Sequence, residues 1–163
     1  MSHGKIYQLA TKPISEDDYV SPEDFYDNHD AYADWVGDAE EGEEREECIG
    51  TLADKLKEIF TPVGGGVLVY NGKQAMKAFK QNWVDAIRQK ASAITEENVT
   101  YHSPRSALRD IVDGTHLDLT ERFVIEEWSG NYAEPLAELI NYADEHMRKG
   151  SKLYIGAVID FHY

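Results

Sequence analysis

The sequence predicts a single α+β domain over residues 1–163, with a small mixed or antiparallel sheet of about four to five strands covered by about four helices. Three observations lead to this prediction. The final segment, residues 152–161, alternates in the manner of a half-buried strand. Amphipathic segments at helical spacing stand between short apolar runs, in mixed order. A chain of 163 residues with 42% hydrophobic content is large enough to bury one core.

Strands are expected at both ends of the chain and at two or three places between them. Residues 5–9 alternate, residues 67–70 and 123–125 are short apolar runs, and residues 98–102 carry a weaker strand signal. We expect both terminal segments to lie in the sheet, with the C-terminal strand at or near its centre. Because side chains alternate along a strand, its odd-numbered residues from Leu153 to Phe161 should share the buried face.

The first helix is expected to begin at Ser21, which can serve as the N-cap, with Pro22 in the first helical position. Phe25, His29 and Val36 then recur at helical spacing, which predicts a helix that ends near residue 37. The other helices are expected at residues 43–60, 73–94, 103–114 and 133–149.

Charge is distributed very unevenly along the chain. Residues 16–47, the acidic N-terminal helical region of the predicted domain, contain fifteen acidic residues and one base, Arg45, and so carry −14 of the net charge of −15. Nucleic acid and anionic membranes are polyanions, so this charge argues against direct binding to either. A protein with a basic surface is the natural complement.

Three interpretations of the acidic region remain open. It is a solvated face that keeps the protein soluble, it pairs with the basic helix predicted at residues 73–94 or with a second copy in a homodimer, or it mimics a polyanion such as DNA. If residues 16–47 were one helix, it would be about 48 Å long, with about one charge per 3.4 Å, which is comparable to a single DNA strand. In size and charge the chain is similar to small acidic antirestriction and toxin-immunity proteins of bacteria, with which it shares no motif.

From these patterns we expect a non-catalytic interaction protein whose acidic face binds a basic protein partner, with Tyr26 or Trp35 as an aromatic anchor. The alternative is a small enzyme or ligand-binding domain whose site is assembled from residues distant in sequence. The predicted binding residues of the acidic face are Asp24, Tyr26, Asp27, Asp30, Asp34, Trp35, Glu40, Glu43 and Glu47.

No segment matches a catalytic or cofactor-binding signature, so we expect no catalytic residue, cofactor or metal. Asp113, His116 and Asp118 lie close together, but this pattern is more typical of a polar loop than of a metal site. The single cysteine, Cys48, fits a buried position in a protein of a reducing compartment, which favours the cytoplasm. No apolar run has the length that a membrane span requires.

Overall fold

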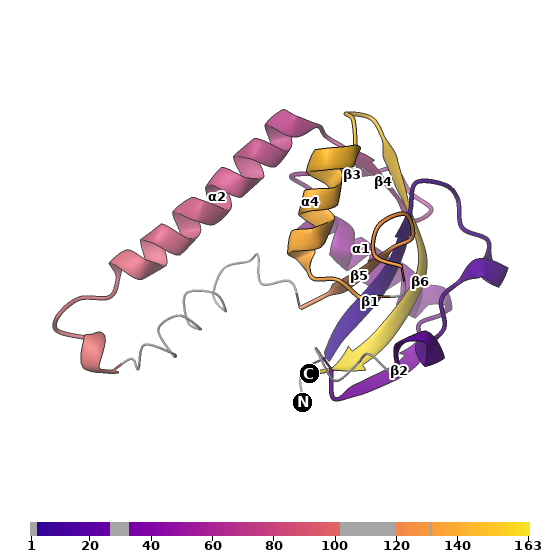
Figure 1. The fold of residues 1–163 in the computed structure, drawn as a ribbon, viewed down its shortest axis with the longest axis horizontal. Coiled ribbons are helices and arrows are strands. Elements are labelled where there is room, and N and C mark those ends of the chain that lie inside the picture. Colours follow the sequence, from indigo (N-terminus) through magenta and orange to yellow (C-terminus); the bar gives the residue numbers. More distant parts are fainter. Residues whose placement is uncertain (1–2, 27–32, 102–119, 131) are drawn as a thin grey trace.

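A computed structural model describes residues 3–26, 33–101, 120–130 and 132–163 of the chain (Figure 1). Its centre is a six-stranded sheet in the order β3-β4-β6-β1-β5, in which β2 also pairs with β6. The sheet is mixed, because β1 and β5 are parallel whereas the other pairs are antiparallel. The predicted α+β class is confirmed, with six strands in place of four or five. The strands are β1 (His3–Ala10), β2 (Trp35–Ala39), β3 (Phe60–Pro62), β4 (Val67–Tyr70), β5 (Arg122–Ile125) and β6 (Lys152–His162).

Strand β6 is central, as the sequence predicts. Residues 154–162 of β6 pair with β1 on one edge, so the two ends of the chain lie side by side (Figure 1). On its other edge, residues 152–154 pair with β4 and residues 159–162 pair with β2. Two short strands therefore share one edge of the longest strand, and residues 155–158 of β6, which lie between them, have no partner strand on this edge.

The prediction that the odd-numbered residues of β6 share one face is wrong, because β6 contains a bulge. The register with β1 shifts between Tyr7 and Leu9, because β6 contains one extra residue beside Gln8. As a result Leu153 and Ile155 pack in one core, whereas Ala157, Ile159 and Phe161 pack in a second core on the opposite face. All five are buried as expected, but the bulge turns the strand over halfway along its length.

Three α-helices of the described residues lie on one face of the sheet: α1 (Gly42–Lys55), α2 (Lys73–Ser92) and α4 (Leu136–His146). Leu52, Met76 and Leu139 lie in the larger core that these helices form with the sheet. The first half of α2 contributes the buried Met76 and Phe79, and the rest of the helix extends beyond the sheet (Figure 1). None of the helices that the structure describes is both long and apolar enough to cross a bilayer.

The opposite face of the sheet is covered by the N-terminal segment, which forms two 3-10 helices, η1 (Glu16–Asp18) and η2 (Pro22–Phe25). Ser21 and Asp24 form a capping box at the start of η2, so the predicted start signal is correct. Phe25 is fully buried against the second core, with Tyr19 and Val20 packed around it. This layer anchors the acidic segment to the sheet.

The prediction of a helix up to residue 37 is wrong at its end, where Trp35–Ala39 form β2. Val36 is buried in the second core, as a helical face would also have placed it, but its backbone pairs with Phe161. The unpaired end of β6 thus gains a partner strand, and tertiary pairing overrides the local helical pattern.

Two smaller differences have similar causes. The helix predicted at residues 43–60 ends at Lys55, because Phe60 pairs with Tyr70 in the sheet. The strand predicted at residues 98–102 is a 3-10 helix (Val99–Tyr101). The helix predicted at residues 103–114 lies outside the described residues.

Gly156 lies in the bulge, and a Cβ atom at this position would stand 2.6 Å from Oε1 of Gln8 and 2.9 Å from Cδ1 of Ile14. Gly156→Ala should therefore destabilise the fold by about 1–3 kcal/mol through overpacking. Gly50→Ala is the matched control, because Gly50 is an exposed residue of α1 with nothing near its Cβ position, and it should stabilise the fold by about 0.5–1 kcal/mol. Urea unfolding of both variants tests this. Equal effects of the two substitutions would show that the bulge does not require glycine.

Ile155 is buried in the larger core beside the bulge, so Ile155→Asp should leave a buried, unpaired charge and unfold the domain. Lys152→Asp, at an exposed position of the same strand, is the control and should change the stability by no more than about 0.5 kcal/mol. Circular dichroism of the purified variants separates the two outcomes. A folded Ile155→Asp variant would contradict the central position of β6.

Candidate functional site

The gap in the edge of β6, at residues 155–158, is closed by a side chain instead of a strand. Arg45 of α1 donates hydrogen bonds from Nη2 to the carbonyl oxygens of Ile155 (2.9 Å) and Gly156 (2.7 Å), and from Nε to that of Gly156 (3.2 Å). The backbone N–H of Glu40 donates to the carbonyl oxygen of Val158 (2.7 Å). Carbonyl groups that β2 and β4 leave unpaired are thus satisfied by a guanidinium and one amide.

Arg45 is held on several sides. Its guanidinium carbon lies 5.6 Å from the centre of the Tyr19 ring, and its Nη1 lies 3.1 Å from a carboxylate oxygen of Glu46. Only 17% of the side chain is exposed. The one base of the acidic region therefore binds the sheet edge. Its charge only partly neutralises the carboxylates around it.

Gln8 of β1 stabilises the same bulge from the other edge of β6. Its Oε1 accepts hydrogen bonds from the N–H groups of Ala157 and Val20, both at 3.1 Å. Its Nε2 donates to the carbonyl oxygen of Asp18 (3.0 Å) and to a carboxylate oxygen of Glu126 (2.8 Å). The oxygen and the nitrogen of this buried amide thus each make two hydrogen bonds, which hold the bulge in place and connect η1 to the sheet.

An open cleft of ≈ 1100 Å³ surrounds Arg45, between the η1 segment and the loop that joins β2 to α1. Its carboxylate residues are mostly exposed and form the rim, whereas Tyr19 and Val20 are half-buried and Ala157 and Val158 are buried. Two of the rim residues, Glu41 and Glu43, flank the N-terminus of α1, where negative charge is favourable to the helix dipole. The acidic residues that line the cleft are Glu16, Asp17, Glu40, Glu41, Glu43 and Glu46.

The cleft contains only part of the predicted binding face. Glu40 and Glu43 line it, and Glu47 is exposed on α1 but does not line it. Asp24 is exposed, and its carboxylate accepts a hydrogen bond from the N–H of Ser21 (2.8 Å). Asp34 is also exposed. Asp27 and Asp30 lie outside the described residues, as do Asp113, His116 and Asp118.

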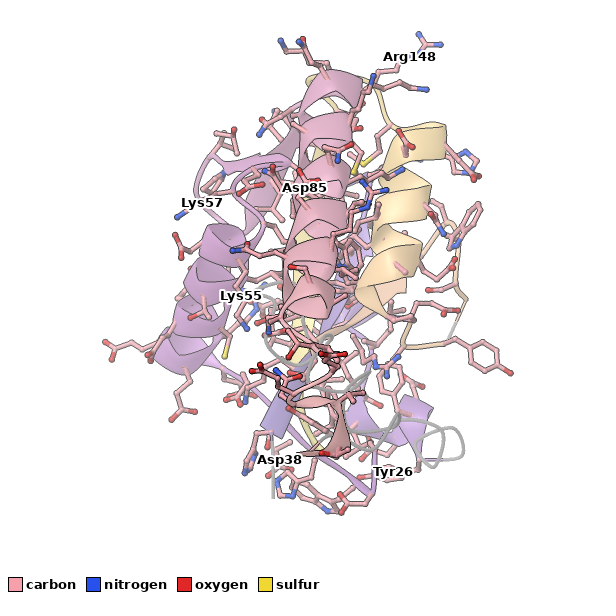
Figure 2. The ribbon with its side chains drawn as sticks, turned by 90° about the vertical axis from the view of Figure 1, so that its left-hand side faces the viewer. Tyr26, Asp38, Lys55, Lys57, Asp85 and Arg148 are labelled. Carbon is pink, nitrogen blue, oxygen red and sulfur yellow. The ribbon has the colours of Figure 1, made fainter. Side chains whose placement is uncertain are left out.

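The two predicted aromatic anchors, Tyr26 and Trp35, are both 49% exposed. Figure 2 shows Tyr26 and Asp38 at one end of the molecule, with Arg148 at the opposite end. The indole of Trp35 lies over Gly37, where a Cβ atom would stand 2.5 Å from the ring. The ring centres of Trp35 and His162 are 4.6 Å apart. Trp35 is therefore held on the sheet, with half of its surface facing solvent.

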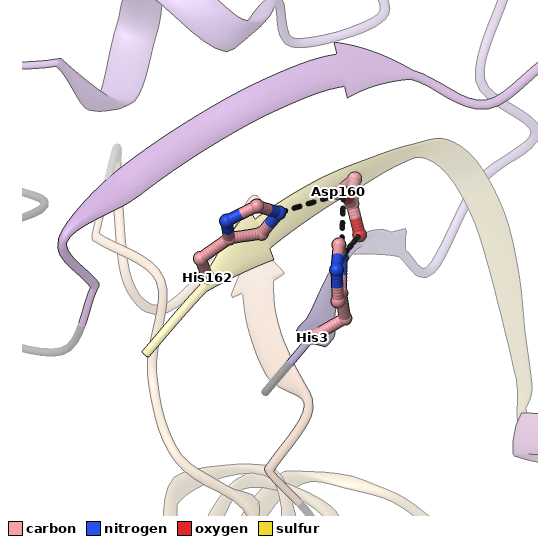
Figure 3. A group of neighbouring side chains, drawn as sticks. All are labelled: His3, Asp160 and His162. Atoms are coloured by element: carbon pink, nitrogen blue, oxygen red, sulfur yellow. Dashed lines mark hydrogen bonds and ion pairs between the residues drawn. The ribbon is translucent and has the colours of Figure 1, made fainter. Parts of the chain in front are cut away.

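A second polar cluster lies at the end of the sheet where β1, β2 and β6 meet. His3 Nδ1 lies 3.1 Å from Oδ2 of Asp160, and His162 Nε2 lies 3.8 Å from the same oxygen (Figure 3). Lys5 Nζ is 2.9 Å from the other oxygen of Asp160, and it also pairs with Glu40. The cluster therefore joins the acidic cleft through Glu40.

The pKa values of Asp160 and Lys5 both move toward the charged state. Burial alone would raise the pKa of Asp160, but hydrogen bonds from Lys5 and His3 outweigh this effect and lower it. Burial alone would lower the pKa of Lys5, but hydrogen bonds to Glu40 and Asp160 raise it. The two residues thus remain an ion pair on a partly covered part of the sheet.

Sequence reasoning did not find this cluster, because its members come from opposite ends of the chain. The signal was present as Asp160 and His162, two residues apart on a predicted strand, and as His3 beside another predicted strand. Only the register between β1 and β6, which sets His3 opposite His162, brings them together.

No protein-family model, curated protein or solved structure matches this chain.

Arg45→Met should destabilise the protein by about 1.5–3 kcal/mol, because it removes charge-assisted hydrogen bonds to strand carbonyls while keeping most of the apolar stem. Arg45→Lys should recover only part of this loss, since one ammonium lacks the forked geometry of the guanidinium. Arg88→Met, at an exposed position of α2, is the control. Urea unfolding measures all three variants. Full recovery by lysine would mean that only the positive charge at this position matters.

Proposed function

We propose that the protein is a non-catalytic interaction module whose acidic cleft binds a lysine- or arginine-rich segment of a partner protein. The observation that carries this proposal is the convergence of six carboxylate residues on one cleft. Among the described residues that line it, Arg45 is the only base, and Arg45 is bonded to the sheet. A charged surface that served solubility alone would have no reason to gather around a concave site.

The composition of the cleft suits the two halves of a basic side chain. Carboxylates on the rim would receive an ammonium or guanidinium group through charge-assisted hydrogen bonds. Tyr19, Val20 and Ala157 below them offer apolar contact for the aliphatic stem that carries the charge. Trp35, exposed on the adjacent strand, offers an aromatic face for an arginine at the edge of the contact.

The folded shape of the acidic region changes the way in which it would imitate a polyanion. The single helix of about 48 Å does not form, because the segment contains η1, η2, β2 and the start of α1. Its charges are grouped around a cleft, which fits a protruding basic segment better than a long DNA-binding groove. A nucleic-acid-binding protein, as in antirestriction or immunity systems, is one class of partner that presents such a segment.

The charge of α2 favours an outside partner over pairing within the chain. Lys80 of α2 pairs with Asp144 of α4, whereas Glu40 pairs with Lys5 of β1. In Figure 1, α2 and the N-terminal 3-10 helices lie on opposite sides of the sheet. The acidic cleft and the basic helix are thus separate surfaces.

The cytoplasm is the compartment that we propose for this interaction. Burial raises the pKa of the Cys48 thiol, and the side chain packs against the larger core. A single thiol of this kind fits a reducing environment.

Binding to an arginine-rich peptide labelled with a fluorophore tests the proposal by anisotropy. Wild-type protein should bind at low salt and lose affinity as the salt rises, because screening at about 0.15 M acts over about 8 Å. The cleft variant Asp17→Asn/Glu41→Gln/Glu43→Gln should bind at least about tenfold more weakly, which corresponds to about 1.4 kcal/mol. Its three substituted side chains are exposed, so the fold should be retained.

The control variant Glu58→Gln/Glu96→Gln/Glu97→Gln removes the same number of charges from exposed positions away from the cleft. It should bind nearly as well as wild type. If both variants lose affinity equally, only the net charge attracts the peptide, and the cleft is not a binding site. A pull-down from the native host with the same three proteins then identifies the partner.

A further inference from the structure

Three side chains from opposite ends of the chain come together at the end of the sheet, in an arrangement that the proposed function does not use. We propose that His3, Asp160 and His162 form a binding site for a divalent transition metal ion, with Zn²⁺ as the ion that fits best (Figure 3). Two imidazoles and one carboxylate are a donor set typical of such ions.

The spacing of the donor atoms fits one metal ion. The three atoms lie within 4.8 Å of one another, and two of the separations are 3.1 and 3.8 Å. Tetrahedral zinc with bonds of about 2.0–2.1 Å requires separations of about 3.3 Å between its ligand atoms. The His3 ring is 57% exposed and the His162 ring only 16%, so rotation mainly of the His3 ring would bring the donor atoms toward this geometry.

The surrounding side chains prepare the carboxylate as a ligand. Lys5 binds Oδ1 of Asp160, which leaves Oδ2 facing both histidines. Lys5 is in turn neutralised by Glu40, so the cluster with neutral imidazoles keeps one net negative charge to offset the metal. Contacts of this kind orient ligands in metal sites and contribute to affinity.

The histidine rings are also held in place. The indole of Trp35 packs against His162, and the centres of the His3 and His162 rings are 4.0 Å apart. Strand pairing fixes the backbones, because His3 stands directly opposite His162 in the register of β1 and β6. Two ligands therefore come from rigid, paired strands.

The site has an open side. The His3 side chain is 57% exposed, so solvent or a ligand can complete the coordination shell. Three protein ligands and an open position are the arrangement of exchangeable or catalytic metal sites, whereas structural zinc sites use four protein ligands. Hard ions such as Mg²⁺ and Ca²⁺ prefer oxygen donors and should bind poorly here.

Isothermal titration of the untagged, chelator-treated protein with Zn²⁺ tests the site. Millimolar Mg²⁺ and about 0.15 M salt should be present, so that weak condensation of cations on the acidic cleft is suppressed. We expect one Zn²⁺ per chain. His3→Ala should weaken binding at least about tenfold, because loss of even an outer contact costs that much in known sites. Co²⁺ should give a visible absorption band that His3→Ala abolishes.

His146→Ala is the matched control, because His146 is also a surface histidine beside a carboxylate, Glu145 at 3.7 Å, but no second histidine of the described residues joins it in a ligand group. It should bind Zn²⁺ as wild type does. His162→Ala provides a second test of the site. If the His162→Ala variant does not fold, the His3→Ala result alone decides, because His3 is exposed and its substitution should leave the fold intact. Absence of saturable binding in wild type, or equal binding by wild type and His3→Ala, would overturn the proposal.

Discussion

The unpaired edge of β6 at residues 155–158 is the constraint on which the rest of the structure depends. A central strand with bare carbonyl groups requires donors, and two short strands cannot cover an eleven-residue strand completely. Arg45 supplies the missing donors from α1, which brings the N-terminus of that helix to the sheet edge. The cleft lies where the Arg45 side chain and the backbone amide of Glu40, instead of a continuous strand, close this gap. The acidic residues next to Arg45 in sequence are thereby placed on its rim.

The bulge makes the two-sided core possible. A strand that kept strict alternation would send every odd-numbered residue of β6 toward the helices. The extra residue beside Gln8 turns the second half of the strand over, so Phe161 packs under the N-terminal layer with Phe25. Gln8 satisfies the freed N–H of Ala157 and holds Asp18 and Val20 in place. One buried amide thus couples the bulge to the acidic segment above it.

Local patterns were enough to predict much of the fold, and non-local pairing explains most of what they missed. The alternation in residues 152–161, the glycine-flanked run at 67–70 and the helical stripe that begins at residue 73 identified β6, β4 and α2. Val36 fits both a helical stripe and a strand, and only its pairing with Phe161 decides between them. The bulge leaves no clear signal in the sequence, because Gly156 and Ala157 are compatible both with a regular strand and with a bulged one. The cluster of His3, Asp160 and His162 depends on the register between β1 and β6.

The cleft and the histidine cluster occupy neighbouring parts of the sheet and share Glu40 through Lys5. If the acidic residues act through the cleft and not through net charge, a basic peptide should bind at one place on the protein. A titration of ¹⁵N-labelled protein with an arginine-rich peptide, followed by backbone amide shifts, tests this directly. We expect shifts that saturate together at Asp17, Glu41, Glu43 and Ala157, with small changes at the exposed end of α2. Shifts spread evenly over all exposed acidic residues, or none at the cleft, would contradict it.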